Sequence, residues 1–394
     1  MPISSTNYTD FSYVKETTPG TTPDTPAFQR LPVTGVNLSD SLAAAVSEVI
    51  RSDRQTDDLV IVDSEVGGDC NYELSYAAFK PIIASLLQGG DLVTIDQAAS
   101  DVTVTASTKT FSSAGTINFA TAGLLPGCRI RVAGFTNAAN NGVFKVATVT
   151  AGAFTVEETI TDEAAGNAVT FDVSFVRNGA EDMDTYTFRK QINAPSASNA
   201  IFYYRGCAIN TMSFEFASGS ILNGSFGVMG RTSEGTDTEI TGETIADVAS
   251  YRIMNGVSSV TSIDISGLPA TTAFSSLSLN VDNQINAAKA IGVLGAADLA
   301  PFSLKVTADI EIYFEDLSMY DAYKDSTEFS LGFTLEDASV NPNIMTIDLP
   351  KCKFEELSEP VDGKDAFLME SGSLRALRHA TLNHMIQVCF FDAA

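Results

Sequence analysis

Long runs of alternating apolar and polar residues dominate this sequence. From Leu304 to Phe314 every second residue is apolar, and most of the residues between them are polar. The segments 212–216 and 328–337 repeat the same alternation. A period of two places successive side chains on opposite faces of a strand, so these segments predict half-buried antiparallel strands. The pattern favours a mainly β fold.

Helical spacing of apolar residues is found in two short places. The segment 76–88 has this spacing and is followed by two glycines, which predicts a short helix packed on a sheet. A weaker pattern over 315–325 predicts a second helix, with Leu317, Tyr320 and Lys324 on one stripe.

The same order of elements occurs twice along the chain. Each half reads as strand, helix, strand, strand and hairpin, over segments 69–74, 76–88, 186–192, 206–216 and 221–229, and again over 309–314, 315–325, 328–335, 351–357 and 360–369. Tight turns are predicted at Asn223-Gly224 and Asp362-Gly363. The order predicts a duplicated β-sandwich or barrel module, each copy with a short flanking helix; generic β patterning is the alternative.

Only the first half is interrupted. Residues 95–177 hold several short strand patterns joined by Gly/Asn turns, among them a strong hairpin turn at Asn140-Asn141-Gly142, and predict an inserted small β domain. The domain boundaries that follow are 31–94 and 178–245 for the first module and 246–394 for the second.

The first thirty residues are polar and carry Pro19, Pro23 and Pro26 within a short stretch. Residues 1–30 therefore predict an N-terminal arm that orders only against a partner. Its aromatic residues are the candidate inter-subunit contacts: Tyr8, Phe11, Tyr13 and Phe28.

Charge excludes one broad class of function. The chain has 23 Lys plus Arg against 49 Asp plus Glu, for a net charge of -26, which argues against a surface that grips nucleic-acid phosphates. The insert has five basic and seven acidic residues, so nearly all of the excess lies outside it. The N-terminus has no secretory pattern, and no apolar run approaches the ~18 residues of a membrane span.

Catalytic and metal chemistry find no support in the residue pattern. The five cysteines are scattered and predict buried, reduced thiols, while the two histidines lie off any common metal-binding register. No phosphate-binding glycine motif occurs, and acidic pairs are too frequent for one to mark a hydrolase. Arg375, Arg378 and His379 are either scattered surface cations or a contact for an acidic patch on a neighbouring subunit. The expectation is a protein that is not an enzyme and has no cofactor and no metal.

Six segments carry a resemblance to a known family. Residues 13–35, 49–58, 68–87, 205–230, 276–295 and 373–391 resemble the major tail tube proteins of long-tailed bacteriophages with flexible, non-contractile tails. The resemblance implies two-sheet sandwiches with a flanking helix, rings that stack into a hollow tube, and a sheet that continues between subunits around a passage for the genome. It also implies a virion protein made in the host bacterial cytoplasm, with the tape measure protein and the tail terminator and tip proteins as partners, and DNA that passes without specific binding.

Two modules per chain suggest a ring of three chains with pseudo-sixfold symmetry; a ring of six chains is the alternative. The insert would then decorate the outside of the tube. Carboxylates lining the channel would repel DNA, and the candidates are Glu215, Asp309, Glu311 and Glu355. A different reading is a phage or cell-surface adhesin whose insert binds a host glycan, and an acidic hydrolase is a third.

Overall fold

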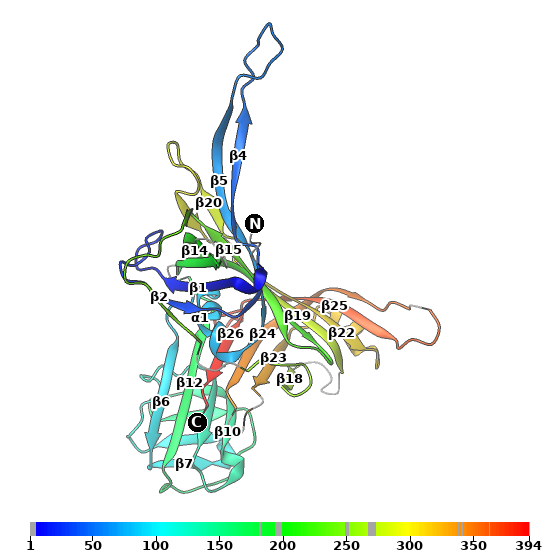
Figure 1. The fold of residues 1–394 in the computed structure, drawn as a ribbon. Helices are drawn as coiled ribbons and strands as arrows, with labels where there is room; N and C mark the ends of the chain where they lie inside the picture. The colour runs from blue at the N-terminus through cyan, green and yellow to red at the C-terminus, as the bar shows by residue number, and fades with distance from the viewer. Residues whose placement is uncertain are drawn as a thin grey trace.

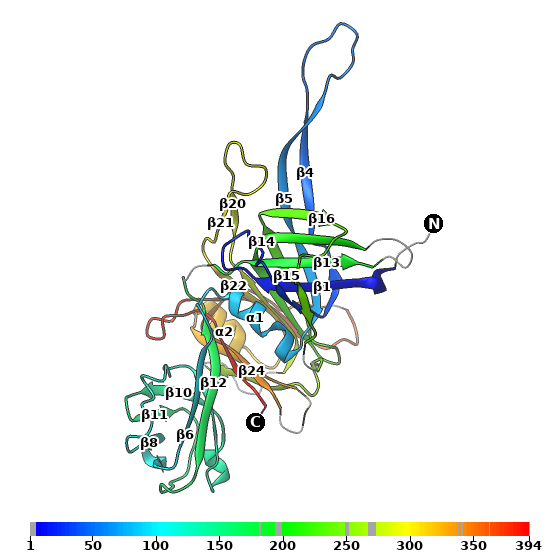
Figure 2. The same ribbon diagram turned by 60° about the vertical axis from the view of Figure 1, so that its left-hand side comes forward.

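The computed structural model describes residues 5–180, 183–193, 199–248, 252–266, 273–337, 339, 342–361 and 363–393. These residues form a molecule of paired β-strands with two short α-helices. A long hairpin projects from one end and a small β domain lies at the other (Figures 1 and 2). The architecture confirms the mainly β fold expected from the alternating pattern.

Two sets of elements follow each other in the same order. The first module comprises β1 (Thr9–Lys15), β3 (Val33–Val36), β5 (Leu59–Glu73), α1 (Tyr76–Leu86), β13 (Tyr186–Ile192), β14 (Ala200–Ala217), β15 (Asn223–Gly230) and β16 (Thr232–Thr236). The second module comprises β18 (Val260–Ser266), β19 (Phe274–Asp282), β22 (Lys305–Tyr313), α2 (Ser318–Lys324), β23 (Phe329–Glu336), β24 (Ile344–Ser358), β25 (Met369–Ala376) and β26 (Gln387–Phe391).

The strand pairing of the two modules matches pair by pair. The first module pairs β1 with β13, β3 with β5, β5 with β15, and β14 with β13, β15 and β16. The second pairs β18 with β23, β19 with β22, β22 with β25, and β24 with β23, β25 and β26. In each module the longest strand, β14 or β24, takes part in two sheets with its two halves. Each module is thus a two-sheet sandwich.

Irregularities of the pairing repeat as well. The register shifts at corresponding places in three strand pairs, first module then second, at Val33/Gly35 and Phe274/Ser276, Tyr186/Phe188 and Phe329/Leu331, and Ile209/Thr211 and Phe354/Glu356. Cys207 and Cys352 consequently take equivalent positions, each opposite an aromatic residue of the preceding strand. A bulge is a specific local feature of a strand, so three matching bulges indicate one duplicated unit rather than generic alternation.

The two modules are joined by ordinary strand pairing. The second half of β14 pairs with β19 from Thr211↔Asp282 to Ala217↔Ser276. This produces one continuous eight-stranded sheet in the order β3/β4, β5, β15, β14, β19, β22, β25 and β24, in which β4 (Ser39–Val46) continues the edge begun by β3. Its two outer edges belong to different modules.

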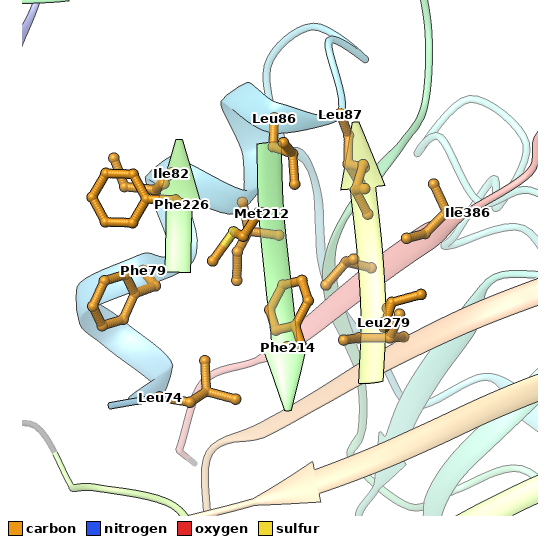
Figure 3. Close-up of a cluster of buried hydrophobic side chains, with 14 of the residues drawn as sticks. Leu74, Phe79, Ile82, Leu86, Leu87, Met212, Phe214, Phe226, Leu279 and Ile386 are labelled. Atoms are coloured by element: carbon orange, nitrogen blue, oxygen red, sulfur yellow. The ribbon is translucent and has the colours of Figure 1, made fainter. Parts of the chain in front are cut away.

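Helix α1 packs on one face of this sheet. Phe79 and Ile82 of the helix lie over Phe226 of β15 and Phe214 of β14 (Figure 3), and all four side chains are buried. The ring of Phe79 lies 4.5 Å from that of Tyr72. Apolar residues at alternate positions of the strands therefore meet the apolar stripe of the helix, and the main core forms between them.

The N-terminal segment does not form the expected arm. Strand β1 pairs with β13 over its full length and with β2 (Ala27–Arg30), so the segment belongs to the first module of its own chain. Phe11, Tyr13 and Phe28 are buried there, and Phe11 stacks on Phe188 at 5.4 Å. The prediction of an arm that orders only against a partner was wrong because these aromatic residues fill the core. Tyr8 alone of the four candidates is exposed.

The predicted turn at Asn223-Gly224 was also wrong. Both residues lie inside β15, and the chain reverses earlier, around Gly219, whose φ of 74° lies in the left-handed region that favours glycine. A Cβ on Gly224 would come within 2.0 Å of the Ser213 carbonyl oxygen, so this glycine permits close strand approach instead. In the second hairpin Gly363 lies between β24 and β25 as expected, while Asp362 is outside the described residues.

Both predicted helices are present, but α2 turns a different face inward. Met319 and Ala322 are its buried residues. Leu317 and Tyr320 of the predicted stripe are exposed, so that part of the prediction was wrong. The helix has seven residues, which is too short for a periodicity argument to fix its orientation.

The predicted insert, from β6 to β12, has a hydrophobic core of its own. The strands are β6 (Val93–Ala99), β7 (Val102–Thr105), β8 (Thr110–Ser113), β9 (Arg129–Ala133), β10 (Gly142–Val149), β11 (Ala153–Val156) and β12 (Val169–Arg177). Strands β9 and β10 do pair as a hairpin, but Asn140-Asn141-Gly142 is not its tight turn, because residues 134–141 connect the two strands and Gly142 already belongs to β10. The pattern at 115–120 forms no strand. The core is rich in phenylalanine, with Phe111, Phe154 and Phe171 in mutual contact.

The insert follows first-module strands in the chain but packs on the second module. Strand β12 pairs with β26, and Cys389 and Phe391 of β26 contribute to the insert's core. Arg129 of β9 spans the contact, because its guanidinium lies 3.0 Å from Asp348 of β24 and 2.9 Å from Asp264 of β18. Burial alone would lower the pKa of Arg129, but the two carboxylates outweigh it and raise that pKa. The charged pair Arg129 and Asp348 is almost fully buried.

A long hairpin leaves the body of the first module. Strand β4 pairs with the first part of β5 from Ser39↔Gly67 to Val46↔Leu59. The hairpin extends well beyond the rest of the sheet (Figures 1 and 2). It exposes the large apolar residues Leu42, Val46, Val49, Ile50, Leu59, Val60, Ile61 and Val62. This is far more apolar surface than an isolated hairpin in water would be expected to show.

Replacing Phe79 by Ala should lower the free energy of unfolding by about 3 to 5 kcal/mol, because a fully buried aromatic ring is removed and a cavity is left. Urea denaturation followed by circular dichroism measures the change. Phe302→Ala removes a ring that is 64% exposed and should change stability by less than about 0.5 kcal/mol. Equal effects at both positions would contradict the core assignment.

Arg129→Met should destabilise the contact between the insert and the second module by about 3 kcal/mol or more, because Asp348 is left buried without its partner. The double variant Arg129→Met/Asp348→Leu removes both charges and should recover most of the loss. Limited proteolysis of the insert and thermal unfolding measure both effects. No recovery in the double variant would mean that the pair is not the cause.

Candidate functional site

One face of the eight-stranded sheet is not covered by either helix and is polar. On β22 the residues Val306, Ala308 and Ile310 point into the core, while Thr307 and Asp309 lie on the opposite face. The other strands alternate in the same way, with serine, asparagine, threonine and acidic residues outward. We call this polar side the open face.

Carboxylates cross the open face in a regular row. Directly opposite residues on successive strands, from β5 to β24, are Glu73, Asn223, Glu215, Ser278, Asp309, Ser373 and Glu356. An acidic residue therefore stands on every second strand, with a neutral polar residue between. At the usual strand separation this puts the carboxylates about 10 Å apart. Such spacing keeps mutual repulsion small while the face stays negative.

All four acids proposed from the sequence lie on this face. Glu215 and Asp309 belong to the row, and Glu311 stands one row away, where it accepts a hydrogen bond of 3.3 Å from the Ser276 hydroxyl. Glu355 is the bulged residue of β24 and forms an ion pair with Arg375. Its charge is therefore compensated within the chain, whereas Glu215 has no ion pair among the described residues.

Sequence reasoning missed two members of the row, Glu73 and Glu356. Glu73 is the last residue of a recognisable strand, and its alternation with Asn71 was visible in the sequence. Glu356 was hidden by the bulge after Phe354, which shifts the strand by one residue. No local pattern reveals a bulge of this kind in advance.

Within the described residues, the cysteines, the C-terminal cations and the metal-ligand types form no second candidate site. All five cysteines are free and buried, as expected. Arg375 pairs with Glu355, Arg378 donates to Asn383, and the His379 ring accepts from the backbone of Leu382, so the C-terminal cations are used locally. Among the described residues, no group of three or more His, Cys, Asp or Glu side chains is placed to hold a metal ion. In the same ranges, none of the helices has the length and apolarity needed to span a membrane.

Both outer edges of the eight-stranded sheet are open within the described chain. Residues 356–358 of β24 pair with β25 on one side only, and β3 and β4 pair only with β5. A hollow of about 760 Å³ lies beside β3 and is lined in part by Phe11, Leu31, Val33 and Val36. Unpaired edges of this length usually need a partner.

The fold thus combines a duplicated sandwich with a long sheet that has one polar, acidic face and an open edge at each end. Such features are typical of β proteins that associate through their sheet edges. The sequence model of the phage tail tube protein family matches residues 6–370. The chain belongs to this family. No curated protein matches it at a significant level. The family places the chain in the tail of a virion as a structural component.

Ser278→Asp should destabilise the protein by about 1 kcal/mol at low ionic strength, because the new carboxylate stands directly between Glu215 and Asp309. The loss should shrink as salt is raised, since the repulsion is exposed to solvent. The isosteric Ser278→Asn variant supplies the uncharged control. A salt-independent loss would indicate that the three side chains do not share one face.

Proposed function

We propose that this protein assembles into rings of three chains that stack into the tube of a non-contractile tail, with the open face lining the channel for the genome. The duplicated module carries the proposal. Six similar modules close a ring with pseudo-sixfold symmetry when each chain supplies two, whereas a single-module chain would need six copies. The matched pairing and the three shared bulges support two equivalent wall segments per chain.

The open face is suited to a channel wall. Its row of acids, Glu73, Glu215, Asp309 and Glu356, would repel DNA phosphates, while the serines and asparagines between them keep the wall hydrated. The opposite face is covered by helices and core and is unavailable to DNA. DNA would pass without specific binding.

The insert would lie outside the tube, because it packs against the second-module sheet that contains β24 and β26 and not on the open face. Its phenylalanines are buried in its own core and do not form an exposed aromatic platform. No feature of the described residues favours the glycan-binding adhesin over a structural role. The tape measure protein and the terminator and tip proteins are the expected partners of the assembled tube.

Electron microscopy of the purified protein, with native mass spectrometry, tests the ring directly. The expected result is three chains per ring with six similar lobes around a central hole. Six chains per ring would overturn the trimer and keep the tube. A monomer that persists at high concentration would overturn the assembly itself.

The exposed apolar hairpin is proposed to contact a neighbouring ring. Replacing residues 44–60 by a short Asn-Gly turn should leave rings intact but prevent their stacking, because the exposed apolar residues Val46, Val49, Ile50, Leu59 and Val60 are removed. Sedimentation and negative-stain images distinguish rings from tubes. Unchanged tubes would show that the hairpin does not hold rings together.

Charge reversal tests the channel wall. Glu215→Lys/Asp309→Lys should make assembled tubes retain double-stranded DNA at low salt and release it as salt is raised. Retention of labelled DNA after spin filtration measures this. Glu157→Lys/Asp162→Lys carries the same charge change on the insert and should have no such effect. DNA retention by the insert variant alone would place the channel elsewhere.

A further inference from the structure

Within each chain, two modules are already joined by a pair of strands. Within the chain, β14 of the first module pairs with β19 of the second from Thr211↔Asp282 onward. The second module's counterpart of β14 is β24, and the first module's counterpart of β19 is the continuous edge formed by β3 and β4. Both counterparts have an open edge in the described chain.

We infer that the edge of β24 pairs with the β3/β4 edge of the next copy of this chain, in the register already used between β14 and β19. This inference rests on the proposed ring and names its subunit contact. The matching bulges fix the correspondence: Thr211 with Glu356 on one side, and Ser276 with Gly35 on the other.

The correspondence translates into four specific pairs between chains. Asp282, Val281 and Asn280 of β19 correspond to Ser41, Asp40 and Ser39, as their equivalent pairing partners on β22 and β5 show. Continuing this register by one residue matches Leu279 with Leu38. The pairs between β24 and the next chain are therefore Glu356↔Ser41, Leu357↔Asp40, Ser358↔Ser39 and Glu359↔Leu38. Ser358 and Ser39 both lie on the open face.

Side-chain packing supports the same register. Phe216 of β14 is buried at the joint inside the chain, opposite Leu277. Its counterpart, Val361, is 79% exposed, and the counterpart of Leu277 is Val36 in the wall of the 760 Å³ hollow. An exposed apolar residue and an apolar hollow thus stand where the chain's own joint buries two apolar side chains.

The register also satisfies the geometry of a closed barrel. Following directly opposite residues from Glu73 across the sheet leads to Glu356, then to Ser41 of the next copy, and finally to Glu65 on that copy's β5. The path has moved eight residues along β5 while crossing eight strands. With about 3.3 Å per residue and 4.8 Å per strand, this stagger gives a strand tilt of about 35°, within the range of closed barrels.

Cysteine cross-linking tests the register. In assembled rings of Ser39→Cys/Ser358→Cys, oxidised glutathione should join neighbouring chains by a disulfide, with two molecules of reduced glutathione released. Directly opposite residues of antiparallel strands have Cα atoms within disulfide range. Non-reducing denaturing gels should show two- and three-chain species and none larger. Each single variant should give neither.

The displaced pair Ser39→Cys/Glu356→Cys keeps the same face but moves two residues along β24, beyond disulfide reach. It should not cross-link, and preferential cross-linking of this pair would overturn the register. Rings seen by microscopy without any Ser39–Ser358 cross-link would overturn the contact and leave the ring standing. Absence of rings in the unmodified protein would overturn the ring and the contact together.

A second variant tests the apolar part of the contact. Val361→Asp should abolish rings while leaving the melting temperature of the single chain unchanged, because Val361 is exposed there. Val257→Asp, at a position 74% exposed and away from either edge, is the matched control and should form rings. Rings of normal size with Val361→Asp would show that this residue is not buried between chains.

Discussion

Backbone hydrogen bonding at strand edges is the constraint on which the rest of this structure depends. A strand that ends a sheet leaves a row of donors and acceptors without partners. The chain meets this need internally once, where Thr211 to Ala217 of β14 pair with β19. That pairing joins the two sandwiches through one long sheet, and the direction of this sheet determines where its open face and its two outer edges lie.

The two faces of that sheet are specialised by the alternation of side chains. Inward positions such as Phe214 and Leu279 build the core under α1, and outward positions carry the carboxylates and hydroxyls. A one-residue slip in any strand would exchange the two sets. The bulges at corresponding places in both modules hold the register against such a slip and align the acids of separate strands in one row.

Much of this architecture could be predicted from the sequence, because alternation is a local signal. The strands around Asp309 and Glu215, both helices and the repeated order of elements were all visible in the pattern of residues. The predictions that failed concern contacts between residues that are distant in the sequence. The segment around Phe11 resembles a polar arm in the sequence, because β13, the strand with which it pairs, follows more than 170 residues later. The sequence around Gly224 predicts a turn, because the reason for a glycine here is the close approach of Ser213, which only the folded structure reveals. The row of acids was found in part, since two of its members required the registers of strands that the sequence does not give.

The insert occurs once in a chain whose sandwich module occurs twice. In an assembly with one kind of single-module subunit, any surface extension is repeated as often as the wall segment itself. Duplication within one chain removes this coupling, because one copy can carry a domain or a long hairpin while the other keeps the plain sandwich. In the proposed ring, the inner surface would then retain a higher apparent symmetry than the outer one, and the two surfaces could diverge independently in evolution.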